Sequence, residues 1–88
     1  MDFRWNDWNV EHIGMHGVSS DEVEMTVRCA HSPFPRKIED DNWLVWGRGQ
    51  GGRLLQVIFV LDEDDTVFVI HARPLTDKEK RRLRRKNR

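Results

Sequence analysis

The spacing of apolar residues changes about a third of the way along the chain. In the first third, two short segments, 6–15 and 20–29, include apolar residues at helical spacing, such as Val23 and Val27, four positions apart. Later they form alternating or nearly continuous runs over 43–48, 53–61 and 66–73. The first spacing indicates helices with one buried side, and the second indicates strands. The pattern therefore predicts two helices followed by three strands.

Capping residues predict where the helices begin and end. Asn6 or Asp7 can cap the first helix, and Gly17 follows it as a residue that accepts the left-handed backbone that ends many helices. Ser19 with Glu22 three positions later forms a capping box ahead of the second helix. Thr76 and Glu79 repeat this spacing near the C-terminus, so a third helix is expected there.

The connections between the strands predict the topology of the sheet. The two prolines in 32–35 make that segment an irregular connector between helices and sheet. Four glycines lie in 47–52 and an acidic turn occupies 62–65, so short turns join the three strands into an antiparallel meander. With a short strand over 3–5, the expected order is β-α-α-β-β-β-α. This is an α+β fold in which two N-terminal helices pack on an antiparallel meander and a basic helix ends the chain.

The distribution of charge matters more than its sum. The 88 residues hold 15 basic and 15 acidic side chains, so the formal net charge is zero. Residues 78–88, however, hold eight basic residues and one acidic residue, a net charge of +7, and residues 1–77 carry −7. The neutral chain is therefore an acidic domain with a strongly basic end, which fits an anionic partner.

Cysteine usage and hydropathy exclude several classes of protein. Cys29 is the only cysteine, so an internal disulfide and a zinc site built on several thiolates are excluded. The longest apolar run, 57–61, is far shorter than the ~20 residues that span a membrane. The first residues include Asp2 and Arg4 and lack the apolar stretch of a signal peptide. We expect a soluble protein of the cytoplasm, with Cys29 as a small buried side chain.

Several short motifs, in order along nearly the whole chain, resemble the BrnT-type toxins, which are small RelE-like ribonucleases of type II toxin–antitoxin pairs. The matching segments are Phe3-Arg4-Trp5-Asn6-Asp7, His16-Gly17-Val18-Ser19, Gly52-Arg53, His71-Ala72-Arg73 and Glu79. The resemblance implies a single RelE-like α+β domain over 1–77, followed by a basic helix or tail over 78–88. The chain departs from the family at Met15, His71 and Leu83, where the family has Lys, Ser and commonly Tyr.

The resemblance implies a toxin that cleaves messenger RNA and is neutralised by a cognate antitoxin. The antitoxin is usually a small DNA-binding protein encoded beside the toxin, and the pair represses its own operon. The expected partners are RNA, free or on the ribosome, and the antitoxin, through which alone the chain would form oligomers. The departures from the family motifs leave a second class open, a catalytically weak or inactive member that binds RNA or protein.

Metal-free RNA cleavage needs groups that move protons and groups that hold the phosphate. His71 and Arg73 are two positions apart and so share one face of the last strand. We expect Arg53 to approach the same face from the neighbouring strand, so that Arg53 and Arg73 clamp phosphate while His71 exchanges protons. The family motif adds His16 to this catalytic set. A solvated strand face also explains His71 and Arg73. A position beside the glycine-rich turn explains Arg53, and packing or helix C-capping explains His16.

Other residues have competing interpretations. His12 and His16 share a helix face but lack the Glu of a metalloprotease motif, so neither a metal nor a cofactor is predicted. The four tryptophans fit core or antitoxin-interface packing, or stacking on bases. The basic end is either a solvated helix face or the binding site for a polyanion, either RNA or acidic antitoxin residues. The RNA-binding candidates are Arg48, Lys80, Arg81, Arg82, Arg84 and Arg85.

Overall fold

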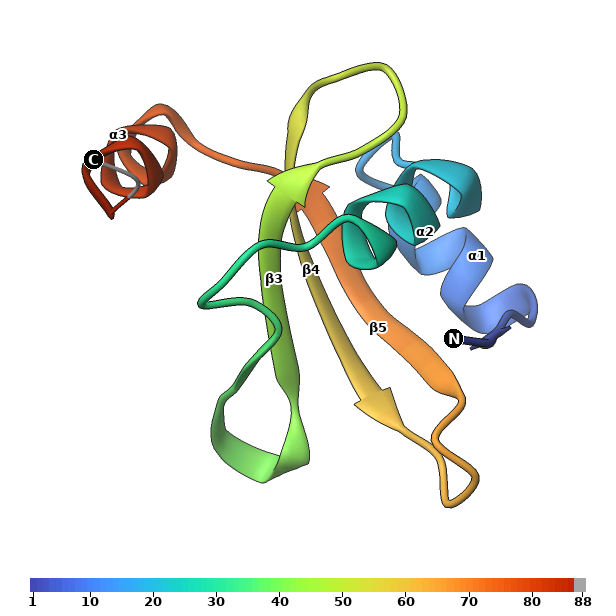
Figure 1. Cartoon of the computed structure of the whole chain (residues 1–88). Coiled ribbons are helices and arrows are strands. Elements are labelled where there is room, and N and C mark those ends of the chain that lie inside the picture. Colours follow the sequence, from blue (N-terminus) through green and yellow to red (C-terminus); the bar gives the residue numbers. More distant parts are fainter. Residues whose placement is uncertain (87–88) are drawn as a thin grey trace.

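The α+β fold is confirmed by a computed structural model, which describes residues 1–86 (Figure 1). Helices and strands follow one another in the predicted order, with two additions between the second helix and the meander: a two-residue strand and a 3-10 turn. The elements are β1 (Phe3–Arg4), α1 (Asp7–Gly14), α2 (Ser20–Arg28), β2 (Arg36–Lys37), η1 (Glu39–Asp41), β3 (Trp43–Arg48), β4 (Leu54–Leu61), β5 (Val67–Pro74) and α3 (Asp77–Lys86).

The predicted meander forms the centre of a five-stranded sheet. The strand order is β1-β5-β4-β3-β2, and the β3, β4 and β5 strands pair antiparallel, as expected from their short turns. The sheet is mixed because β1 pairs parallel with β5 at one edge, while β2 pairs antiparallel with β3 at the other. Figure 1 shows α2 lying across the sheet, α1 beside β5, and α3 on the side of the sheet away from α1 and α2.

One face of the sheet, which we call the core face, is buried beneath α2. Its side chains come from alternate positions of the strands and are covered by Val23 and Val27 of α2 together with Ile13 of α1. Burial of apolar surface on this face is the main stabilising contribution to the fold. The core-face residues are Val45, Leu55, Val57, Phe59, Val67, Val69 and Ala72.

A bulge in β5 determines which face His71 occupies. Val69 lies opposite Phe59, but the register shifts at the next position, and His71 lies opposite Ile58. Strict alternation from Val69 would place His71 on the core face. The bulge instead returns Ala72 to the core face and places His71 on the opposite face, and re-aiming a side chain in this way is typical of bulges near functional sites.

The helix caps form as predicted at one helix and only in part at another. At α3, the Thr76 hydroxyl accepts from the Glu79 N–H at 3.2 Å, and the Glu79 carboxylate accepts from the Thr76 N–H at 2.9 Å. At α2, Ser19 accepts from the Glu22 N–H at 3.2 Å, but the Glu22 carboxylate binds Arg53. Only half of the capping box at α2 therefore forms, because the Glu22 carboxylate is bound in an ion pair with Arg53.

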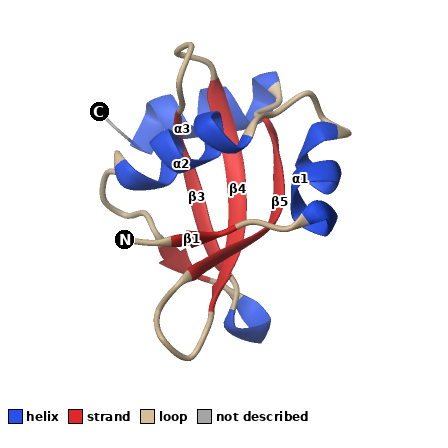
Figure 2. Cartoon of the chain, turned by 90° about the vertical axis from the view of Figure 1, so that its right-hand side faces the viewer, coloured by secondary structure: helices blue, strands red, loops and turns tan. Residues whose placement is uncertain are grey.

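One prediction about a buried side chain needs correction. Cys29 was expected to be buried, but it is exposed at the end of α2, where its Sγ lies 3.6 Å from the Met25 sulfur. Trp5, Trp43 and Trp46 pack against the core, whereas Trp8 is 52 % exposed. Trp8 lies in the first turn of α1, which covers the β5 edge of the sheet (Figure 2), and its ring centroid is 6.0 Å from that of Phe68 on β5.

Gly49 is required by the close approach of α2 to the β3–β4 turn. A Cβ atom at this position would lie 2.6 Å from both the Glu22 carbonyl oxygen and the Thr26 hydroxyl. We expect Gly49→Ala to lower the free energy of unfolding by about 1–3 kcal/mol, measured by urea denaturation, because the helix must move. Gly14→Ala is the control, since nothing lies within 4 Å of its Cβ. An equal loss in both variants would contradict the packing argument.

Candidate functional site

Two imidazoles from distant parts of the chain meet at the β5 edge of the sheet. His16 lies in the turn after α1, His71 lies on β5, and their ring centroids are 5.7 Å apart in an edge-to-face arrangement. His12, one helical turn before His16, stacks on Trp8 at 4.9 Å. His16 is exposed and His71 is half-buried, so the pair is open to solvent on one side. We call His16 and His71 the histidine pair.

The surroundings of His71 favour its neutral form. Partial burial is the main cause that lowers the pKa of His71 below its usual 6.5, and the nearby positive charges of Arg73, His16 and His12 lower it further. A histidine with a lowered pKa is unprotonated at neutral pH. His71 is therefore ready to accept a proton.

Arg73 lies beside His71, but its charge is largely compensated. Its guanidinium donates two hydrogen bonds to the Glu79 carboxylate, at 2.7 and 2.9 Å, and a third to the Pro74 carbonyl at 3.0 Å. The ion pair with Arg73 is the main cause that lowers the pKa of Glu79 to about 2. The pair also fixes the first turn of α3 against the end of β5.

The pKa of Glu79 leads to a pH-dependent stability. Because its pKa is lower in the folded chain than the usual 4.5, the stabilisation is complete above about pH 4.5 and disappears as the pH falls toward 2. We expect Glu79→Gln to lower the free energy of unfolding at pH 7 by about 1–3 kcal/mol and to reduce its fall at acidic pH. Urea denaturation at pH 7 and pH 3 measures both effects. The control is Glu63→Gln, at an exposed position of the acidic turn; an equal change there would contradict a specific role for Glu79.

Arg53 does not join the other two candidates on one face, and that expectation was wrong. Its guanidinium binds the Glu22 carboxylate at 2.6 and 2.8 Å and the Gly17 carbonyl at 2.6 Å. These partners belong to α2 and the turn before it, on the core-face side of the sheet, whereas Arg73 binds α3. The sequence separation of 31 residues between Arg53 and Glu22 left no local pattern from which to predict this pair.

A groove lined by basic residues lies between the β3–β4 turn and α3. Its volume is about 480 Å³, and Leu54 and Pro74 form apolar parts of its wall. We call it the basic groove. It collects four of the predicted cationic candidates, although Arg53 was predicted as a catalytic rather than an RNA-binding residue. These are Arg48, Arg53, Lys80 and Arg84.

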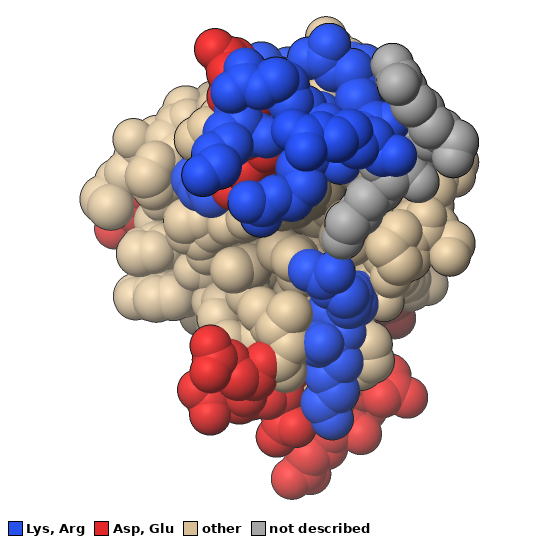
Figure 3. All heavy atoms as spheres, turned by 90° about the vertical axis from the view of Figure 1, so that its left-hand side faces the viewer, with Lys and Arg blue, Asp and Glu red and all other residues tan. Residues whose placement is uncertain are grey.

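The other predicted RNA-binding residues, Arg81, Arg82 and Arg85, are exposed on α3 and do not line the groove. Figure 3 shows that Lys and Arg side chains gather over one end of this face, while Asp and Glu side chains occupy the other end. On this face, basic side chains thus gather mainly at one end, although a column of them also reaches the acidic end. The acidic segments 39–41 and 62–65 lie at the end of the sheet away from α3 (Figure 1).

The structure therefore separates the candidates into two groups, the histidine pair with Arg73 and the basic groove with the outer side of α3. Sequence reasoning missed Gln56, whose side chain accepts a hydrogen bond from the Trp46 indole at 3.0 Å and which lies opposite Arg73 in the sheet. It also missed the bulge. The signal was a break in the alternation of apolar residues, because Val67 and Val69 are two positions apart but the next core-face residue, Ala72, follows after three.

None of the protein-family models, curated proteins or solved structures compared with the chain matches it. Among the helices of residues 1–86, none combines the length and the apolar character needed to cross a membrane. In the same part of the chain, no three His, Cys, Asp or Glu side chains are grouped as a metal ion would require.

Proposed function

We propose that this chain is a ribonuclease toxin of a type II toxin–antitoxin pair, which cleaves messenger RNA without a metal ion and is neutralised by a cognate antitoxin. The observation that carries the proposal is the meeting of His16 and His71, which are 55 positions apart in sequence, beside Arg73. His16 belongs to a segment that resembles a motif of the BrnT-type toxins, whereas His71 stands where the family has Ser, next to the matching Ala72 and Arg73. The basic groove and α3 supply the positive charge that an RNA partner requires.

The histidine pair has the groups that cleavage through the 2′-hydroxyl requires. Neutral His71 takes the proton of the 2′-hydroxyl, and the oxygen attacks the adjacent phosphorus. His16 in its protonated form gives a proton to the departing 5′-oxygen, leaving a 2′,3′-cyclic phosphate and a free 5′-hydroxyl. Arg73 stabilises the charge on the phosphorus-bound oxygens once the phosphate replaces Glu79 as its partner.

The proposal places the protein in the cytoplasm, where it meets messenger RNA, free or on the ribosome. Its protein partner is an antitoxin encoded by the neighbouring gene. Acidic side chains of the antitoxin would compete with RNA for the basic groove and α3. Oligomers of the toxin form only through the antitoxin.

Inducible expression of the chain, with and without the neighbouring gene, tests the proposal. We expect growth arrest and fragmented messenger RNA when the chain is expressed alone, and normal growth when both genes are expressed. The purified protein should cleave RNA in EDTA, because no step uses a metal ion. Unimpaired growth with intact RNA would overturn the proposal.

One observation favours a second function, a catalytically weak member that binds RNA or protein. Both arginines expected to clamp phosphate, Arg53 and Arg73, are held by carboxylates in two hydrogen bonds each. Three of the five N–H groups of each guanidinium are already used, which leaves two for phosphate. RNA binding by the purified protein without any cleavage would favour this second function.

A further inference from the structure

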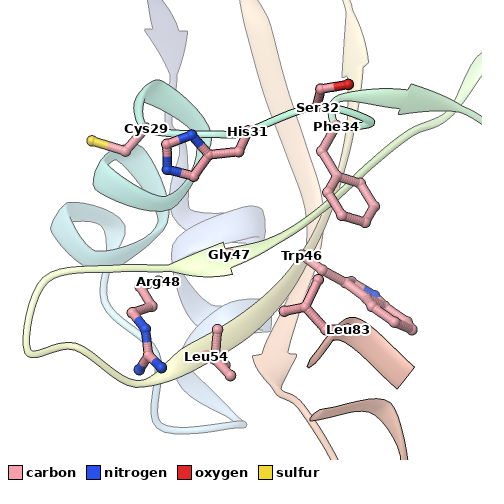
Figure 4. A pocket seen from close by; sticks show the side chains of 9 residues that line it. All are labelled: Cys29, His31, Ser32, Phe34, Trp46, Gly47, Arg48, Leu54 and Leu83. Carbon is pink, nitrogen blue, oxygen red and sulfur yellow. The ribbon is translucent and has the colours of Figure 1, made fainter. Parts of the chain in front are cut away.

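An aromatic pocket lies beside the basic groove, between the connector after α2, the strand β3 and the helix α3. Its volume is about 240 Å³ (Figure 4). Phe34 and Trp46 contribute aromatic rings whose centroids are 6.2 Å apart, and Leu83 of α3 contributes an aliphatic wall. His31 and Ser32 supply polar groups at the exposed side of the pocket. The lining of the pocket thus combines aromatic and aliphatic side chains with polar ones.

The pocket and the basic groove are adjacent. Arg48 and Leu54 line both, so an apolar hollow with aromatic walls opens next to a groove with four cationic side chains. Single-stranded nucleic acids are bound by this combination, because the phosphates follow positive charge while each base stacks on an aromatic ring. A volume below the ~300–1,000 Å³ of sites for drug-sized ligands suits one ring system rather than an extended ligand.

The pocket is aligned with the candidate catalytic residues. Trp46 lies opposite Gln56, and Gln56 lies opposite Arg73, so the three form one row across β3, β4 and β5. The hydrogen bond from the Trp46 indole to Gln56 shows that these two side chains share the face opposite the core face. Two strand spacings of about 4.8 Å put the backbones of Trp46 and Arg73 roughly 10 Å apart. One short stretch of single-stranded RNA can reach both.

We propose that this pocket binds one unpaired base of the RNA strand, stacked on Trp46, while Arg48 holds the phosphate beside it. The inference rests on the proposed function in that it names how the RNA is held near the histidine pair. It requires binding alone, however, and can be tested with an RNA that cannot be cleaved.

The test uses the full chain and a short 2′-O-methyl RNA, which lacks the attacking hydroxyl. In two-dimensional ¹⁵N NMR spectra, we expect the Trp46 indole N–H signal and the amide signals of 31–34 to shift on addition of the RNA. Trp46→Leu should weaken binding by roughly 5- to 150-fold, measured by fluorescence anisotropy, because one base loses its stacking partner. Trp43→Leu, three positions earlier on the same strand and outside the pocket, should leave the affinity unchanged.

Shifts confined to the amides of α3 would overturn the proposal, because they would mean that phosphates bind without insertion of a base. Equal losses of affinity for Trp46→Leu and Trp43→Leu would also overturn it. A mononucleotide that binds as tightly as the RNA would overturn it too, because the pocket would then be a site for free nucleotides. The spectra of the unmodified chain give the answer even if Trp46→Leu does not fold. Insertion of a base without cleavage of ordinary RNA would uphold the pocket while the ribonuclease proposal failed.

Discussion

Replacing His71 with alanine should slow RNA cleavage by roughly 10²–10⁴-fold, the usual effect of removing one proton-transfer group. His71 is the better candidate for the base because its pKa is lowered, by burial first and then by Arg73, His16 and His12. Binding of a non-cleavable RNA should be unchanged, since His71 does not line the basic groove. Single-turnover cleavage of a labelled RNA measures the rate separately from the affinity.

The matched control is His12→Gln, one turn before His16 on the same helix. His12 stacks on Trp8 and raises the local positive charge, but it has no role in moving a proton. The rate at neutral pH should therefore survive this change. A His71→Ala enzyme as fast as the unmodified one would contradict the assignment, and so would an equal loss in His12→Gln.

The lowered pKa of His71 also sets the sign of the pH dependence. As the pH falls, His71 remains neutral below its usual pKa of 6.5 and loses its role as base only when it is protonated at a lower pH. The acidic limb of the profile of kcat/KM should therefore lie below pH 6.5. The same shift makes the folded chain less stable as the pH falls from 6.5 through the lowered pKa, because the unfolded chain binds the proton more readily.

Local patterns were sufficient to predict most of the fold. The strand Trp43–Arg48 has the predicted bounds, β4 begins one residue later than expected, and β5 is shifted by one residue at both ends. The helix α3 begins as predicted because both halves of its capping box, Thr76 and Glu79, lie within four residues of each other. These features depend on neighbours in the sequence, which is why the sequence alone predicts them.

The features that the sequence did not predict correctly depend on contacts between residues far apart in the chain. The Glu22 carboxylate was expected at the helix cap, but Arg53 offers it two charge-assisted hydrogen bonds, which are stronger than one bond to a backbone N–H. The same ion pair directs the Arg53 side chain toward α2 and the turn before it. The bulge at the centre of β5 decides the position of His71. It places His71 on the face opposite the core face, whereas regular alternation from Val69 would place it on the core face.

The contribution of the basic groove can be separated from that of the total charge of α3. Lys80 and Arg84 are four positions apart and line the groove, whereas Arg81 and Arg85 have the same spacing on the same helix but do not line it. We expect Lys80→Gln with Arg84→Gln to remove two phosphate contacts. The slope of log K against log salt should then fall by roughly 1.4, and the affinity for single-stranded RNA should fall roughly 25-fold at ~0.1 M salt.

The pair Arg81→Gln with Arg85→Gln is the matched control, because it removes the same charge from the same helix. If RNA follows the groove, this control keeps most of the affinity and most of the salt dependence, and only the weak long-range attraction of the lost charges disappears. Equal losses in the two pairs, measured by fluorescence anisotropy over a series of salt concentrations, would contradict a defined path through the groove. They would mean that RNA contacts the whole basic surface of α3, which Figure 3 shows to be exposed.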